Sequence, residues 1–233
     1  MIGTPTIALV LCGCGIGDGS DVLEAAGSLI ALSQEGCRVR CFAPSRAQRE
    51  VIDHASGRAM QDARHMLIES ARLTRGVIEP LSELDPVRLD AVLLPGGGGV
   101  LRNLTNFAVR GAGATLAPDV LDALMPVFLA GRPFVALGPA ALVPALLARE
   151  LGRHGARLTF GHEDEAGEYI DALEAWGLRH VECALDEACI DDAQRIVSVP
   201  AGLYAKASPA DLFGAAQAAV SAMCWLLAQQ EGG

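Results

Sequence analysis

The stretch "FVALGPAALVP" (134–144) has the pattern of a buried strand that runs directly into a helix. In α/β enzymes such a strand-to-helix turn often carries the catalytic nucleophile. A nucleophile needs a side chain with a reactive lone pair, as in Cys, Ser or Thr. Residues 116–158 contain none of these three residue types, so the turn offers only backbone groups.

Four other side chains are suited to proton transfer or nucleophilic attack. Asp21, in the first Gly-rich loop, is either a functional carboxylate or the N-cap of a helix that starts near Val22. Glu24, one helical turn later, either pairs with Asp21 or faces solvent. Cys14 in the same loop is either a reactive thiol or a small buried side chain. His162 follows the segment "ARLTF" and is either a general base or an exposed loop histidine.

Two Gly-rich turns follow apolar runs. "GCGIGDG" (13–19) has Asp18 where a Rossmann fingerprint that starts at Gly13 needs its third glycine, and "PGGGG" (95–99) lacks the Lys-Ser/Thr of a P-loop. We therefore expect no dinucleotide or nucleoside triphosphate site, and no other cofactor. The glycines either only bend the chain without a Cβ clash, or their N–H groups line an oxyanion or carboxylate pocket.

The composition narrows the class of partner. The 233 residues carry a net charge of −10 without a cluster of Lys or Arg, so we expect neither nucleic acid nor an anionic membrane as a partner. The seven cysteines are an odd number and lack zinc-finger spacing, which argues against a disulfide framework and against a metal site. The N-terminus lacks a basic segment, and we find no apolar run of the roughly 18–20 residues that span a bilayer. These features predict a cytoplasmic protein.

Hydrophobic periodicity predicts strands that alternate with helices. Apolar runs indicate strands at 6–11, 38–44, 89–95, 133–137, 156–160 and 195–200, and helical spacing indicates helices at 22–36, 58–74, 118–130 and 209–229. Such alternation is typical of a parallel sheet covered by helices on both faces. We expect a single domain over 1–233, with the loops 12–21, 95–103 and 138–141 meeting at the carboxyl ends of the strands.

Several stretches together resemble the ThiJ/PfpI superfamily, relatives of the class I glutamine amidotransferases, and within it the ElbB-type, glyoxalase-like branch. The resemblance implies a flavodoxin-like, three-layer α/β sandwich with a mainly parallel sheet, assembled as a homodimer. The matching stretches are "GCGIGDGSD" (13–21), "CFAP" (41–44), "LIESARLTRGVI" (67–78), "LDAVLLPGGGG" (89–99) and "NLTNFA" (103–108), with weaker similarity in "RLTFG" (157–161) and "IVSVPA" (196–201).

The resemblance also implies what the active site has lost. The family places a reactive Cys in the strand-to-helix turn, beside an acid that is Glu in the family's "DGSE" and Asp21 in this chain's "DGSD". Gly138 aligns best with that Cys, and Ala136 is the alternative. No cysteine lies between Phe42 and Glu182, so under either alignment the nucleophile is absent.

We therefore predict an enzyme without the family's cysteine, acting by acid–base chemistry on a small carbonyl, imine or carboxylate compound as a hydratase, lyase or isomerase. Asp21, Cys14, Glu24 and His162 are the candidate catalytic residues. The amides of Gly97, Gly98 and Gly138 would steady negative charge, Pro139 would shape the wall, and Asn106, which matches the branch, would bind substrate or lock a loop. The alternative is a pseudoenzyme that binds a small molecule as a regulatory dimer. A third option, an amidotransferase-like partner subunit, lacks a glutaminase Cys-His-Glu set.

Overall fold

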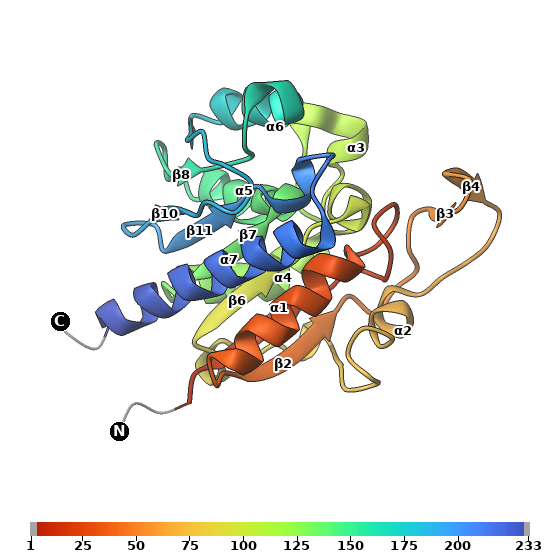
Figure 1. Cartoon of the computed structure of the whole chain (residues 1–233), viewed down its shortest axis with the longest axis horizontal. Helices are drawn as coiled ribbons and strands as arrows, with labels where there is room; N and C mark the ends of the chain where they lie inside the picture. Colours follow the sequence, from red (N-terminus) through yellow and green to blue (C-terminus); the bar gives the residue numbers. More distant parts are fainter. Residues whose placement is uncertain (1–3, 231–233) are drawn as a thin grey trace.

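The apolar runs of the sequence form the centre of a seven-stranded sheet (Figure 1). The computed structural model describes residues 4–230. The strand order is β10-β11-β7-β6-β1-β2-β5, and β10–β11 is the antiparallel pair in this sheet. The strands are β1 (Thr6–Val10), β2 (Arg38–Ala43), β5 (Glu79–Pro80), β6 (Ala91–Leu94), β7 (Phe134–Leu137), β10 (Cys189–Asp191) and β11 (Ile196–Val199).

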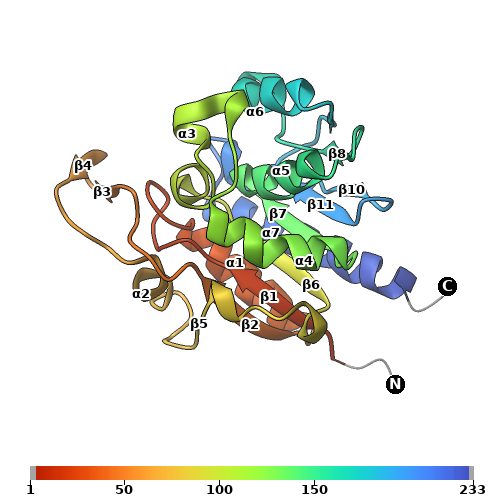
Figure 2. The same ribbon diagram turned by 180° about the vertical axis from the view of Figure 1, so that it is seen from behind.

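Helices cover both faces of this sheet, because its central strands are apolar on both sides. Ile7 and Leu9 of β1 pack in one core with α1 and α7, whereas Ala8 and Val10 belong to the opposite core with α4 and α5. Figures 1 and 2 show these two layers from opposite sides. The helices are α1 (Val22–Gln34), α2 (Met66–Ser70), α3 (Phe107–Arg110), α4 (Pro118–Leu129), α5 (Leu142–Glu150), α6 (Glu163–Ala175) and α7 (Pro209–Gln230). The predicted flavodoxin-like α/β sandwich is confirmed.

The closing helix α7 contradicts the expectation that the sequence contains no apolar run long enough to span a bilayer. Its residues Pro209–Gln229 are long and apolar enough to cross a bilayer, with a mean hydropathy of 1.4. Ala215, Ala219 and Met223 of this helix are buried against α1 and the sheet. Packing inside the fold therefore accounts for part of the apolar composition of α7.

The predicted helix at 58–74 is wrong over its first half. Residues 51–60 form a hairpin of β3 (Val51–Asp53) and β4 (Arg58–Met60), and helix α2 begins only at Met66. The carboxylate of Asp53 accepts hydrogen bonds from Ala55 N and Ser56 Oγ, and Gly57 has φ +70°, so local turn chemistry overrides the helical spacing. We call residues 46–65 the hairpin arm, which projects from one end of the sheet (Figure 1).

The region after β7 also departs from the prediction. The strand predicted at 156–160 is reduced to β8 (Arg157–Leu158), which pairs with β9 (Arg179–His180) in a separate two-stranded sheet. Helix α6 was not anticipated, because its acidic first turn obscures the apolar spacing of Tyr169, Ile170 and Leu173.

Candidate active site

The three loops predicted to meet do so at the carboxyl ends of the central strands. Asp21 N donates to Gly96 O over 2.8 Å, and Gly99 N donates to Gly19 O over 3.0 Å, which joins the first two loops. A Cβ placed on Gly96 would lie 2.8 Å from Cδ of Pro139, so the third loop is in contact as well. The predicted convergence is confirmed.

The glycines after β6 allow this close approach. Gly97 has φ +110°, and a Cβ at that position would overlap Gly19 O. A Cβ on Gly99 would lie 2.7 Å from Sγ of Cys12. The amide of Gly98, predicted to steady a substrate's charge, donates to Ile16 O over 2.7 Å. Packing between loops thus explains these glycines, and the Gly98 amide is already engaged.

The strand-to-helix turn lies at Gly138. Strand β7 ends at Leu137, Gly138 adopts φ +52°, and a short 3-10 helix (Gly138–Ala141) leads into α5. The alternative position, Ala136, lies within β7, paired with Leu94 and Ser198. Gly138 is therefore the turn residue. Its left-handed backbone suits glycine, and Pro139 suits the first turn of a helix.

Glu24 is the acid that faces this turn. Its side chain is 1% exposed. Oε2 accepts a hydrogen bond from Gly96 N over 2.6 Å, and Oε1 accepts one from Gly202 N over 2.9 Å. A Cβ placed on Gly138 would lie 3.5 Å from Oε1 of Glu24. Burial, and then the charge of Asp21, raise the pKa of Glu24 from 4.5 to about 7, although the two amides oppose this shift.

Asp21 has a well-defined structural role. Its Oδ1 accepts hydrogen bonds from Leu23 N over 2.7 Å and from Glu24 N over 3.3 Å, so it is the N-cap of α1. The residue is 5% exposed. Its Oδ2 lies 3.8 Å from the position of a Cβ on Gly202, the residue whose amide donates to Glu24. Of the predicted pair of acids, Asp21 caps the helix and Glu24 reaches the turn.

The other predicted catalytic residues lie apart from this acid. Burial and the nearby Glu69 raise the pKa of the half-buried Cys14 thiol, which disfavours the nucleophilic thiolate. His162 precedes α6, where its Nδ1 contacts the carboxylate of Glu182 and its ring stands edge-on to Tyr204. Within residues 4–230, no hydrogen bond or ion pair joins either residue to Glu24.

Asn106 also lies outside the turn. Its Nδ2 donates to Oγ1 of Thr115 over 3.0 Å, and its Oδ1 accepts from Thr115 N over 2.8 Å. These bonds lock the loop between α3 and α4, which agrees with the loop-locking alternative.

A fourth loop was missed. It follows β11 and brings Gly202 to Glu24 and the carbonyl oxygen of Pro200 to within 3.5 Å of a Cβ on Gly138. The sequence signal was the run "AGL" (201–203) directly after the strand predicted at 195–200. The site is thus framed by four strand ends.

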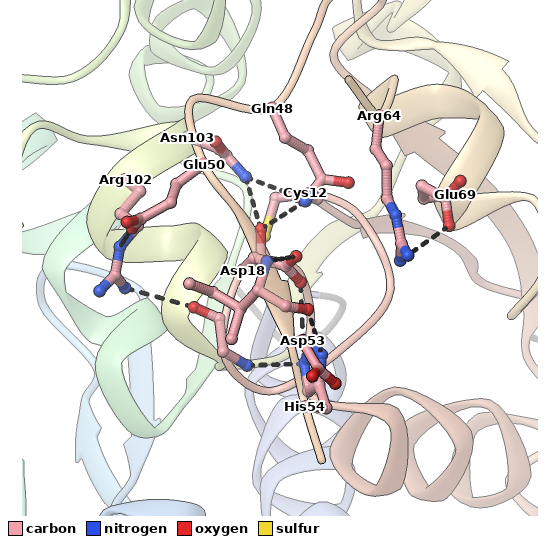
Figure 3. A network of polar contacts seen from close by, with 12 residues as sticks. Cys12, Asp18, Gln48, Glu50, Asp53, His54, Arg64, Glu69, Arg102 and Asn103 are labelled. Atoms are coloured by element: carbon pink, nitrogen blue, oxygen red, sulfur yellow. Dashed lines mark hydrogen bonds and ion pairs between the residues drawn. The ribbon is translucent and has the colours of Figure 1, made fainter. Parts of the chain in front are cut away.

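A second polar cluster joins the hairpin arm to the first loop (Figure 3). The backbone oxygen of Asp18 accepts from Nε2 of Gln48 over 2.9 Å and from Nδ2 of Asn103 over 2.8 Å, while its Oδ2 accepts from Ile52 N over 2.7 Å. Nε2 of His54 accepts a hydrogen bond from Gly17 N over 3.0 Å. The part of the chain that the structure describes holds no group of three or more His, Cys, Asp or Glu placed for a metal ion.

Comparison with known proteins identifies relatives over most of the chain. No protein-family model matches it. It is 37% identical over 202 residues to the human glutamine amidotransferase-like class 1 domain-containing protein 3, mitochondrial, covering 84% of this chain and 74% of that protein. It is 33% identical over 216 residues to the ES1 protein, mitochondrial, of Danio rerio, covering 87% and 78% of the two chains.

Solved structures support the same relationship. An isoprenoid biosynthesis protein with an amidotransferase-like domain from Ehrlichia chaffeensis superimposes with a TM-score of 0.87 at 27% identity, over 96% of this chain and all of that one. A ThiJ/PfpI domain protein from Brachyspira murdochii, at 16% identity over 95% and 98% of the chains and a TM-score of 0.56, shares the fold.

The relatives overturn one prediction. Those from human, rat and Danio rerio are all named as mitochondrial proteins, which contradicts the predicted cytoplasmic location. Free cysteines indicate a compartment that keeps thiols reduced, and they do not distinguish the cytoplasm from the interior of an organelle.

Because the fold and the sequence identity to these relatives agree, the chain belongs to the ES1/ElbB-like proteins of the class I glutamine amidotransferase-like, DJ-1/ThiJ/PfpI superfamily.

Proposed function

We propose that this chain is an enzyme that moves a proton on a small carbonyl or imine compound without covalent catalysis, as a hydratase, lyase or isomerase does. The observation that carries this proposal is the Glu24 carboxyl, which is buried beside the Gly138 turn with its pKa raised to about 7. A group whose pKa lies near the working pH gives and takes protons readily. Glu24 thus replaces Asp21 as the proposed acid–base residue.

The charge of the site narrows the class of substrate that it can bind. Asp21 and Glu24 lie together, and the charge of Asp21 raises the pKa of Glu24. Within residues 4–230, no Lys or Arg forms an ion pair with either acid. A free carboxylate would be repelled here, whereas a neutral carbonyl or a protonated imine would not. In this proposal the Gly138 amide steadies the developing oxyanion.

Proton exchange tests the proposal directly. Purified protein is incubated in D₂O with a panel of small ketones, aldehydes and imines, and loss of the α-proton signal is followed by ¹H NMR. We expect exchange with at least one compound, reduced about 10²–10⁴-fold in Glu24→Gln, the usual effect of removing a positioned proton-transfer group. Glu83→Gln, at an exposed position, is the matched control. Exchange that is undiminished in Glu24→Gln would overturn the assignment.

One observation favours the alternative of a non-catalytic binding protein. Both oxygens of Glu24 accept backbone hydrogen bonds, so this acid also ties two strand ends together. A binding protein would retain a small molecule detectable by native mass spectrometry and would exchange no α-protons in the NMR assay. The homodimer implied by the family stays a prediction, which light scattering in solution tests.

A further inference from the structure

A cavity lies outside the Gly138 turn, between the hairpin arm and the segment after the Gly-rich loop. Its volume is about 350 Å³, within the roughly 300–1,000 Å³ range of small-molecule sites. Asn106 contributes to its lining, but its amide group is bound to Thr115. The other lining residues are Arg49, Glu50, Leu101, Arg102, Ala108 and Val109.

The charged residues of the lining carry an excess of positive charge. Nε of Arg102 donates to Oε2 of Glu50 over 2.8 Å, which neutralises the acid of the lining (Figure 3). Within residues 4–230, no ion pair or hydrogen bond engages the guanidinium of Arg49, whose backbone N donates to Oδ1 of Asn103. One guanidinium is thus left to pair with a bound anion. A planar guanidinium matches a carboxylate in two parallel hydrogen bonds.

Apart from Asn106, the rest of the lining is apolar. Leu101, Ala108 and Val109 contribute to it, and Val109 is 81% exposed. A bound apolar chain would remove part of this surface from water, at about 25 cal/mol for each Å² covered. The cavity therefore brings guanidinium groups and apolar side chains together within the space of a small molecule.

Arg102 links this cavity to the first Gly-rich loop. It lies in a π-helix (Val100–Leu104), a local form found often at functional sites. Its Nη1 donates to Gly17 O over 3.3 Å, while Nε holds Glu50 of the hairpin arm. An anion that drew the Arg102 guanidinium toward Arg49 would loosen its contact with the loop that ends at Asp21.

We propose that this cavity is a second ligand site, distinct from the Gly138 turn, that binds a small carboxylate with a short apolar chain. The Arg49 guanidinium pairs with the carboxylate, Arg102 contributes its remaining N–H groups, and Leu101 and Val109 cover the chain. The site prefers an anion, whereas the acids at the turn disfavour one, so the two sites take ligands of different charge.

Hexanoate is the probe, with its binding followed by isothermal titration and by ligand-observed NMR on the full chain. We expect millimolar or tighter binding, weakened about 10–100-fold in Arg49→Gln, as the loss of a charged hydrogen-bonded pair implies. Arg58→Gln, on β4 of the same arm and outside the lining, should bind as the wild type does. Absence of binding to the wild type, or equal binding by Arg49→Gln, would overturn the proposal.

The apolar part of the lining is tested separately. Val109→Asp places a negative charge in this part of the lining and should abolish hexanoate binding, while Val77→Asp, equally exposed and outside the lining, should not. Inorganic phosphate is the comparison ligand. If it binds as tightly as hexanoate and Val109→Asp weakens both equally, the site is a general anion site and the carboxylate proposal is wrong. These binding results do not depend on catalysis at Glu24.

Discussion

Two buried acids on the same side of the molecule are held in different ways. Glu24 and Asp18 are each 1% exposed. Both oxygens of Glu24 accept hydrogen bonds from backbone amides of glycines that follow strands, so the ends of the sheet hold this carboxyl in place. Oδ2 of Asp18 accepts a hydrogen bond from Ile52 N of the hairpin arm. Its Oδ1 is buried, lies 3.7 Å from Nε2 of His54, and has no hydrogen-bond partner among residues 4–230.

This difference in hydrogen bonding distinguishes the rigid site at the Gly138 turn from the hairpin arm, which is attached to the first loop. At the turn, main-chain groups of neighbouring strands hold the acid, and burial tunes its proton affinity. At the arm, side chains such as that of His54 make the contacts. Nε2 of His54 accepts a hydrogen bond from Gly17 N, so the ring proton is on Nδ1, which donates it to Ile52 O. The His54 contact of the arm is exposed, whereas Glu24 is buried, so local opening can break it more easily.

The largest effect is expected where the loops approach most closely at the turn. Gly97→Ala forces an alanine to φ +110° and brings its Cβ into Gly19 O. Together, backbone strain and overpacking should destabilise the protein by about 2–5 kcal/mol, measured by urea unfolding. Gly113→Ala is the control, because a Cβ there meets no atom of residues 4–230 within 4 Å. A loss below about 0.5 kcal/mol in Gly97→Ala would mean that the loops can separate freely.

A second large effect concerns pH. The folded protein keeps the Glu24 proton up to about pH 7, whereas the ordinary pKa of a glutamate is 4.5. Between these values the folded state binds more protons than the unfolded chain, so stability falls as pH rises. The Glu24 contribution to this fall should be on the order of 3 kcal/mol.

Urea unfolding from pH 4.5 to 8 should show this fall in the wild type and a flatter profile in Glu24→Gln. The slopes of stability against pH are compared, and not the stabilities themselves. A Gln side chain has one acceptor oxygen and cannot accept the hydrogen bonds of both the Gly96 and the Gly202 amides, so it is destabilising at every pH. Parallel profiles for the two proteins would show that Glu24 titrates at an ordinary pKa.

Sequence reasoning located the turn but not its acid. Continuous apolar runs predicted β1, β6, β7 and β11, and Pro and Gly marked the strand ends, because these are local signals. Asp21 and Glu24 were both identified. Which one reaches Gly138 depends on Gly202, which lies 178 residues from Glu24 along the chain. The hairpin arm was missed because the turn at Asp53–Gly57 favours a β-hairpin, whereas the helical spacing of apolar residues from 58 onward predicted a helix.

The arm should open more readily than the turn. His54→Ala removes the acceptor of Gly17 N and the donor to Ile52 O, which costs about 0.5–1.5 kcal/mol for each hydrogen bond. Hydrogen exchange read by mass spectrometry should speed up over residues 51–60 and stay unchanged over β6 and β7. Equal acceleration in both regions would show that arm and sheet open as one unit.

The smallest effect, that of Asp21→Asn, separates charge from capping. Asn caps a helix about as well as Asp, so Asp21→Asn should change stability by a few tenths of a kcal/mol, whereas Asp21→Ala should cost about 0.5–2 kcal/mol. The Asn variant also removes the negative charge that helps to raise the pKa of Glu24. We therefore expect the fall in stability that marks the Glu24 titration to be smaller and to end at a lower pH in Asp21→Asn, so that the variant matches the wild type near pH 4.5 and is slightly more stable near neutral pH. If the Asn variant leaves that profile where it was, Asp21 acts on the turn only through α1, and burial alone sets the pKa of Glu24.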